Sequence, residues 1–182
     1  PLAPVWGTMN LPTTSAIVAM TQARSASAPT VPPARFAVFD GDLDAEWQEL
    51  LGAASALAID TEAMGLIHGR DRLCLVQICD AHDNVCCIRL ARGQQGAPRL
   101  KALLENAAIE KVFHFARFDV AALAQNLGIG VAPIFCTKIA SRLGRTYAPR
   151  HGLKEVVQEL VGVELDTVSY THLRAHETVL DL

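Results

Sequence analysis

The sequence predicts an α/β domain in which helices pack against a central mixed sheet. Short apolar runs rich in valine, isoleucine, leucine and cysteine recur from Phe36 onward, as expected of strands buried within a sheet. Between these runs lie segments whose apolar residues recur at i, i+3, i+4 and i+7, the spacing of one helix face. This alternation of strand-like and helix-like segments is typical of a layered α/β fold.

The first half of the domain is predicted to contain one helix and three strands. Asp44 is suited to cap a helix that carries Trp47, and Gly52 is suited to end it. The predicted strands cover residues 56–60, 73–79 and 85–88. A turn over 80–84 joins the last two strands, because aspartate and asparagine favour turns.

The second half is predicted to contain one strand and four helices. A short apolar run predicts the strand over 111–115. Periodic apolar residues predict helices around 100–107, from 120 to Gly128, around 139–143, and from 153 to 160 after Gly152. Glycine at position 128 suits a helix end, because it adopts a left-handed backbone without strain.

The composition indicates a single globular domain preceded by an extension. A chain of 182 residues, 51% hydrophobic and 19% charged, is typical of one ordinary soluble domain. Residues 1–35 are rich in proline, serine, threonine and alanine without periodicity, which predicts disorder. A net charge of −3 does not itself indicate a nucleic-acid-binding protein, although a local basic strip is compatible with it.

The cysteine pattern and the hydropathy predict a cytoplasmic protein. The five cysteines form no Cys-x-x-Cys pair, so we expect free, small apolar side chains in a reducing compartment. No apolar run approaches the roughly 18 residues of a membrane span. We therefore expect no membrane partner.

Two carboxylates, Asp60 and Glu62, end the first buried run. At i and i+2 of a strand they point to the same face. Such a pair is costly unless a cation lies between them, and Mg²⁺ commonly takes one or two carboxylates together with substrate phosphates. The alternative is a strand end that reaches solvent, with both acids hydrated.

Asp119 is the next candidate, because it follows the predicted strand 111–115 and precedes a predicted helix. It is either the N-cap of that helix or a third carboxylate at the sheet edge beside Asp60 and Glu62. Three such acids would be suited to a two-metal site that activates water for phosphoryl displacement.

Several ordered motifs resemble those of the DEDD superfamily of 3′–5′ exonucleases. Residues 59–66 (IDTEAMGL) resemble its first motif and residues 114–119 (HFARFD) its second. Three further stretches narrow the resemblance to ribonuclease D: 73–77 (LCLVQ), 136–143 (CTKIASRL) and 151–155 (HGLKE). The resemblance covers the domain predicted over 36–166, and the order of several motifs makes it specific.

The resemblance implies a ribonuclease H-like three-layer fold and 3′–5′ exoribonuclease activity with two Mg²⁺ or Mn²⁺ ions. Asp60 would bridge both metals, Glu62 would hold one, and Asp119 would hold the other. The implied substrates are RNA 3′ ends of tRNA-like or other structured precursors, without an obligate protein partner.

The resemblance also implies residues that contact nucleic acid. Met64 and Leu66 match positions near the terminal nucleotide, although ordinary packing is an equal alternative. His114 matches a polar position near the site. A local excess of positive charge follows, at Lys138, Arg142, Arg145, Arg150 and Lys154. The first three share one helix face by spacing and would either track the phosphate backbone or form a solvated face.

The resemblance breaks off after Asp166. The family implies a fourth carboxylate on a C-terminal helix, four residues after a tyrosine. The residue four positions after Tyr170 is arginine, so we expect residues 167–182 to be a non-homologous tail, one metal site to be incomplete and activity to be low in this form. His176 and Asp181 show the His-x4-Asp spacing of a sister subclass, which we interpret as coincidence because no following helix holds Asp181 rigid.

Two rival functions stay open at this point. The first is a proofreading-type DNA 3′–5′ exonuclease, because the contacts that would recognise the 2′-hydroxyl cannot be placed from sequence. The second is a catalytically dead nucleic-acid-binding module. Metal-dependent release of mononucleotides from a labelled 3′ end would separate these classes.

Overall fold

The computed structural model describes residues 34–65, 67 and 69–165. Most of the predicted N-terminal extension and the whole predicted tail therefore lie outside the described residues. Within them is a sheet of six strands in the order β1-β4-β3-β2-β5-β6. The strands are β1 (Phe36–Asp40), β2 (Ala56–Ala63), β3 (Leu73–Cys79), β4 (Val85–Arg89), β5 (Glu110–Phe113) and β6 (Ile134–Cys136). The helices are α2 (Ala45–Gly52), α3 (Pro98–Leu104), α4 (Arg117–Leu127), α5 (Thr137–Gly144) and α6 (Leu153–Val161).

The sheet is mixed, as predicted. Strands β2, β3 and β4 form an antiparallel meander at its centre. Strand β1 pairs in parallel with β4 on one side, and β5 and β6 continue in parallel from β2 on the other. The β2–β3 register shifts between Glu62 and Ala63, so the pairing becomes irregular where the first predicted motif leaves the sheet.

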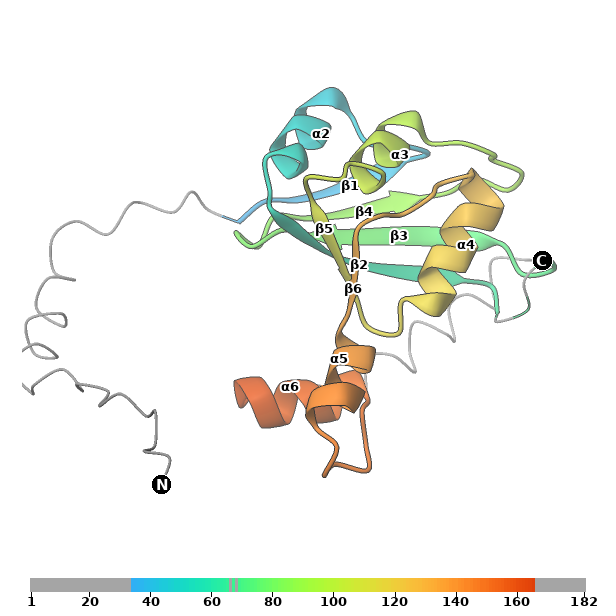
Figure 1. Ribbon diagram of the computed structural model, residues 1–182. Coiled ribbons are helices and arrows are strands. Elements are labelled where there is room, and N and C mark those ends of the chain that lie inside the picture. The colour runs from blue at the N-terminus through green and yellow to red at the C-terminus, as the bar shows by residue number, and fades with distance from the viewer. Residues whose placement is uncertain (1–33, 66, 68, 166–182) are drawn as a thin grey trace, which may run out of the picture. The chain divides into compact units, whose positions relative to one another are not determined.

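One hydrophobic core joins the sheet to three helices. Figure 1 shows α2 and α3 side by side above the sheet, and α4 contacts β2 and β3. Along β2, Leu57 and Ile59 are buried while Ala58 and Asp60 are exposed. This alternation places the core on one face of β2 and the Asp60 side chain on the other. Helices α5 and α6 follow β6 and lie below the sheet in the same view.

Local signals set several element boundaries as predicted. The Asp44 carboxylate accepts a hydrogen bond from the Trp47 N–H at 2.8 Å and caps α2. Gly128 ends α4 in the left-handed conformation, with φ of 63°. The turn at 80–84 is held by Asp80, whose Oδ1 accepts from the N–H groups of His82 and Asn84.

Several features differ from the sequence prediction. Strand β1 was not among the predicted strands. Strand β5 ends at Phe113, two residues before the predicted end, because Phe115 adopts a left-handed backbone with φ of 72°. Strand β6 was not predicted, since its three residues are too few to show a period. All five cysteines are free, as predicted, but only Cys86 is fully buried. No helix in the described part of the chain is long and apolar enough to cross a bilayer.

Candidate active site

Asp119 lies directly against the middle of the first motif. The last residue pair between β2 and β5 joins Ala58 and Val112, so β2 continues beyond its neighbour. The Asp119 Oδ1 accepts hydrogen bonds there from the Thr61 N–H at 3.1 Å and from the Thr61 hydroxyl at 2.7 Å. Thr61 stands between Asp60 and Glu62, and this contact therefore brings Asp119 to the strand that carries both acids.

The alternative interpretation of Asp119 as a helix cap is wrong. Helix α4 begins at Arg117 with Ala116 at the cap position, so Asp119 is in the first turn. Its side chain accepts hydrogen bonds from Thr61 on β2, and only 5% of the residue is exposed. A buried carboxylate with its hydrogen bonds donated by a neighbouring strand is a positioned group.

The two aspartates carry unfavourable charge in this arrangement. Burial raises the pKa of Asp119, the nearby Asp60 charge raises it further, and the hydrogen bonds from Thr61 act in the opposite direction. Asp60 is exposed as a residue, yet partial burial of its carboxyl group raises its pKa, again against a hydrogen bond from the Thr61 backbone. A cation between these groups would relieve both desolvation and repulsion.

The residues of this site meet part of what a divalent metal ion requires of its ligands. Among residues 34–165 as described, no group of three histidine, cysteine, aspartate or glutamate side chains is arranged to hold a metal ion. Magnesium, however, commonly uses one or two carboxylates and takes its remaining ligands from water and substrate phosphates. Asp60 and Asp119 would supply two such carboxylates, and their assignment as metal ligands stays a prediction. Glu62 is half-buried on the same strand, and its assignment as a metal ligand stays a prediction.

His114 is held in one orientation beside the site. The Thr137 hydroxyl donates to the Phe113 carbonyl at 3.1 Å and therefore accepts from Nδ1 of His114 at 2.9 Å. The proton of a neutral ring is thus on Nδ1. Its Nε2 is buried and makes no hydrogen bond within the described residues. Burial, and then the charge of Lys138, lowers the pKa of His114, while the backbone of His151 acts more weakly in the opposite direction.

The loop after β2 depends on a glycine that sequence reasoning did not single out for this role. A Cβ on Gly65 would lie 2.3 Å from Oδ2 of Asp71, far inside van der Waals contact. That same oxygen accepts the Ile67 N–H at 2.9 Å. Met64, predicted to contact nucleotide, is 49% exposed at the start of this loop. Leu66, the second predicted contact, lies outside the described residues.

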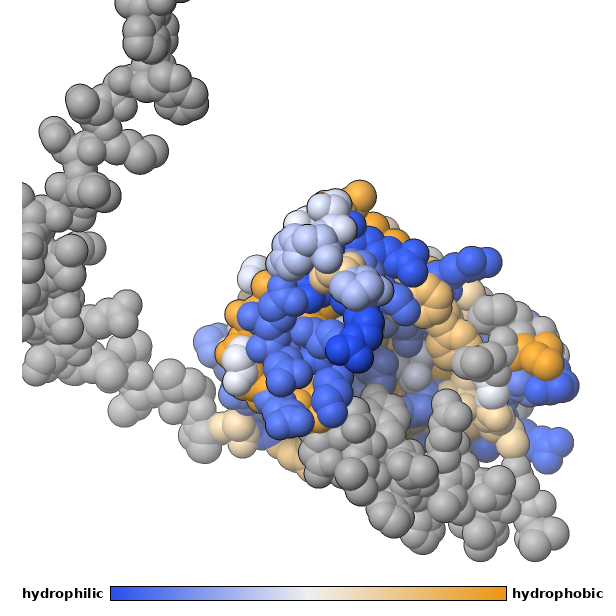
Figure 2. Space-filling view, turned by 90° about the horizontal axis from the view of Figure 1, so that it is seen from below, coloured by the Kyte–Doolittle hydropathy of each residue, from blue (hydrophilic) through white to orange (hydrophobic). Residues whose placement is uncertain are grey.

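The basic strip predicted after the third acid divides into exposed and buried members. The Lys138 ammonium lies 4.3 Å from the centroid of the Phe115 ring, and Arg142 is exposed on α5. Hydrophilic side chains gather on the face seen in Figure 2, where α5 and α6 lie. The positions of Lys138 and Arg142 are compatible with the predicted contacts to a phosphate backbone.

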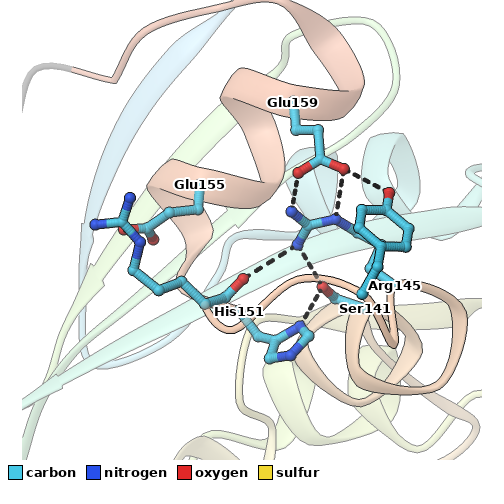
Figure 3. Close-up of polar contacts among 7 residues, drawn as sticks. Ser141, Arg145, His151, Glu155 and Glu159 are labelled. Carbon is cyan, nitrogen blue, oxygen red and sulfur yellow. Dashed lines mark hydrogen bonds and ion pairs between the residues drawn. The ribbon is translucent and has the colours of Figure 1, made fainter.

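Arg145 corrects the prediction that it shares this exposed face. It lies beyond the end of α5 and is only 6% exposed. Figure 3 shows its guanidinium between Glu159 of α6, the Ser141 hydroxyl and the carbonyl of residue 150. Because α5 stops at Gly144, the helical spacing that placed Arg145 on the face of Arg142 no longer applies. Residues Tyr170, His176 and Asp181 lie outside the described residues.

Comparison with known proteins shows the family of this chain. The model of a family described as 3′–5′ exonuclease matches residues 36–175. This chain belongs to that family. Its match covers both carboxylate-bearing segments, those of Asp60 and of Asp119, and the resemblance to ribonuclease D is confirmed by curated relatives of that name.

The relatives include ribonuclease D sequences and structures of NrnC. Ribonuclease D of Acidiphilium cryptum (strain JF-5) is 33% identical over 116 residues, which are 64% of this chain and 29% of that protein. Brucella melitensis NrnC bound to pGG is 44% identical, with a TM-score of 0.68 over 74% of this chain and 65% of that one. The same protein with bound Mg²⁺ matches at 44% identity and a TM-score of 0.68, over 73% and 65% of the two chains. The chain thus spans less than a third of the curated relatives it matches.

Proposed function

We propose that this chain is the catalytic domain of a 3′–5′ exoribonuclease that hydrolyses RNA from its 3′ end with divalent metal ions. The observation that carries the proposal is the contact of Asp119 with Thr61, between Asp60 and Glu62. It joins the two motifs in space across 58 residues of sequence. Membership in the exonuclease family supports a hydrolytic role for these acids.

Asp60 and Asp119 are the proposed principal metal ligands, with Glu62 completing the set. Bound Mg²⁺ or Mn²⁺ would activate water and neutralise charge on the phosphate. The raised pKa values of Asp60 and Asp119 support this role, because desolvated acids in proximity favour a cation. The related NrnC structure with bound Mg²⁺ supports divalent metal as the cofactor class.

Two cations on α5, half-buried Lys138 and exposed Arg142, are the proposed contacts to the RNA backbone. Lys138 lies beside Phe115, and Arg142 follows it by one helical turn. Nonspecific backbone contacts of this kind make affinity fall with salt. Met64 is proposed to contact the terminal nucleotide, and His114 is proposed to support the site in its neutral form. A cytoplasmic location and the use of structured RNA precursors also stay predictions.

A second candidate substrate class is a very short oligoribonucleotide. It is favoured by the 44% identity to an NrnC structure bound to pGG, whereas identity to the ribonuclease D sequence is 33%. The two classes differ in the length of strand that the protein must hold. Initial rates on RNA from two to about ten nucleotides long would separate them, since only the second candidate predicts a maximum at the shortest lengths.

The proposed function is tested by end-labelled RNA. With Mg²⁺ present, a 3′ label should appear first in mononucleotides, while a 5′ label should pass through a ladder of shortened strands. EDTA and Asp60→Asn should each abolish both patterns. Equal rates on a matching DNA strand would favour the proofreading-type alternative. Binding of RNA without any release of nucleotide would favour the catalytically dead module and overturn the proposal.

A further inference from the structure

Phe115 presents an aromatic ring to solvent at an unusual backbone position. It lies in the turn between β5 and α4 with φ of 72°, and 47% of the residue is exposed. A left-handed backbone is a genuine outlier for a bulky residue without glycine's freedom. Such conformations persist only where the surroundings determine them, and they concentrate at functional positions.

The neighbours of Phe115 hold this turn in place. On one side, His114 is fixed through Nδ1 to the Thr137 hydroxyl at 2.9 Å. On the other side, Ala116 is 7% exposed and belongs to the core. With both neighbours anchored inward, the ring of Phe115 is directed outward, although an aromatic side chain ordinarily gains free energy by burial.

Phe115 lies in the turn that leads directly to Asp119. The Phe115 carbonyl accepts the Phe118 N–H at 3.3 Å, and the next residue is Asp119, in the first turn of α4. The residue that carries the exposed aromatic ring therefore precedes the proposed metal ligand by four positions in the chain. Base stacking on aromatic side chains is a common way to hold a single strand without reading its sequence.

We propose that Phe115, supported by Lys138, is a stacking platform for a nucleobase of the RNA strand whose 3′ end lies at the carboxylates. The inference deepens the proposed exoribonuclease function and rests on it for the identity of the ligand. Lys138 Nζ lies 4.3 Å from the ring centroid. A cation over one face of the ring orients it through cation–π attraction, and the same charge is available to an adjacent phosphate.

The substitution Phe115→Gly separates stacking from folding. It removes the ring and relieves the left-handed strain, which glycine tolerates, so the midpoint of thermal unfolding should stay the same or rise. Affinity for a fluorescein-labelled single-stranded RNA, measured by anisotropy in EDTA to prevent hydrolysis, should fall about 5- to 150-fold. Phe115→Trp should restore it. Phe36→Ala is the matched control, because Phe36 is 69% exposed on β1, distant in the sheet order.

RNA that lacks a single base separates stacking on Phe115 from a purely structural role of that residue, because a structural role would not depend on any one base. Abasic positions placed in turn along the RNA should weaken binding to the wild-type chain at one position near the 3′ end. At that position the abasic RNA should bind the wild-type chain and Phe115→Gly equally, because the lost partner is the same. Lys138→Met should weaken binding and reduce its dependence on salt, while Lys138→Arg should retain it.

The outcomes for the platform and for the function are distinct. If the wild-type chain hydrolyses RNA but Phe115→Gly binds it unchanged, the platform is wrong and the proposed function stands. A lower unfolding midpoint in Phe115→Gly, with no position-specific abasic effect, would show that the ring packs against protein. If the wild-type chain binds RNA without hydrolysis and Phe115→Gly weakens binding, the platform stands without the enzyme. If the wild-type chain neither binds nor hydrolyses RNA, both are overturned.

Discussion

At the scale of single residues, Asp60 has opposing effects on activity and stability. Partial burial holds its pKa above the ordinary value, so at neutral pH the folded chain carries a charge that it disfavours relative to the unfolded chain. That cost is removed when the carboxyl becomes an uncharged amide of the same shape. The same change removes the proposed bridging metal ligand.

We therefore predict that Asp60→Asn loses more than about tenfold in exonuclease rate, since metal-assisted charge stabilisation is lost. In EDTA its unfolding midpoint should equal or exceed that of the wild-type chain. In Mg²⁺ the wild-type chain should gain stability that the variant does not. Asp40→Asn, at an exposed carboxylate paired with Arg89, is the control. Activity within tenfold of the wild-type rate would place the metal elsewhere.

His114 makes stability depend on pH in a defined direction. Burial lowers its pKa in the folded state, so between that value and the unfolded value near 6.5 the unfolded chain binds more protons. The contribution of neutral His114 to stability is therefore fully present above about pH 6.5. It is lost as the pH falls below about 6.5 and through the lower pKa of His114 in the folded state.

The prediction is that His114→Gln loses less thermal stability than the wild-type chain between pH 7 and pH 5. Glutamine can still donate to the Thr137 hydroxyl without adding a titrating ring. Differential scanning fluorimetry at matched ionic strength would measure the difference. The exposed turn residue His82 provides the control as His82→Gln. An identical pH slope in His114→Gln and the wild-type chain would contradict the assignment of a disfavoured charge to His114.

At the scale of elements, one buried cation, Arg145, links Ser141 of α5 to Glu159 of α6. Arg145 donates from Nε to Glu159 at 3.1 Å and from Nη1 to the Ser141 hydroxyl at 2.9 Å, and its Nη2 also contacts Glu159 (Figure 3). The Tyr147 hydroxyl donates to the same carboxylate at 2.6 Å. The hydrogen bonds from Arg145, and then from Tyr147, lower the pKa of Glu159 to about 2.

We predict that Arg145→Met releases α6 from α5 while the sheet stays folded. Hydrogen exchange over Leu153–Val161 should become faster, with little change over β2 and β3, whose core does not include Arg145. Arg145→Lys should not restore protection, because an ammonium cannot make the paired contacts of a guanidinium. Arg142→Met, on the exposed side of α5, is the control. Unchanged exchange in α6 would show that apolar contacts alone hold the pair.

The pH dependence of that contact follows from the same carboxylate. The folded-state pKa of Glu159 lies below its unfolded value, so the ion pair stabilises α6 above the unfolded value. This contribution is lost only as the pH falls through about 2. Mild acid should therefore destabilise the region of His114 before it releases α6.

At the scale of the whole molecule, a completely buried lysine ties three segments together. Lys111 on β5 is 0% exposed, and its ammonium donates to the carbonyls of Asn106, Ile109 and Ala132 at 2.5 to 2.7 Å. These carbonyls belong to the turn before β5 and to the segment that leads into β6. A buried charge is tolerated here because its donors are satisfied.

Lys111→Met should destabilise the chain by at least about 1–3 kcal/mol, because it leaves buried carbonyls without a donor. Urea unfolding followed by circular dichroism would measure the change. Lys101→Met is the matched control, since Lys101 is a half-exposed lysine that contacts Glu105 and the Gly128 carbonyl. Its exposed ion pair should contribute much less, because solvent screens it. Equal losses of unfolding free energy in Lys111→Met and Lys101→Met would contradict the claim that burial makes Lys111 more important for stability.

The sequence by itself determined the features that depend on neighbours within a few residues. The Asp44 cap, the glycine end of α4 and the strand over Leu73–Cys79 were all predicted correctly. These features are local. The hydrogen bonds that cap a helix end and the alternation of side chains along a strand each involve residues at most about four positions apart. The motif order around Asp60 and Asp119 was sufficient to indicate the exonuclease family.

Only the tertiary structure decided how those elements meet. Thr61 can contact Asp119 because β2 runs beyond the end of β5, and that depends on sheet order and register rather than on either segment alone. Arg145 is buried because α5 ends one residue before it and α6 supplies Glu159. Phe115 is exposed because its two neighbours are anchored inward. Each outcome depends on contacts between segments distant in sequence, whose geometry no local pattern encodes.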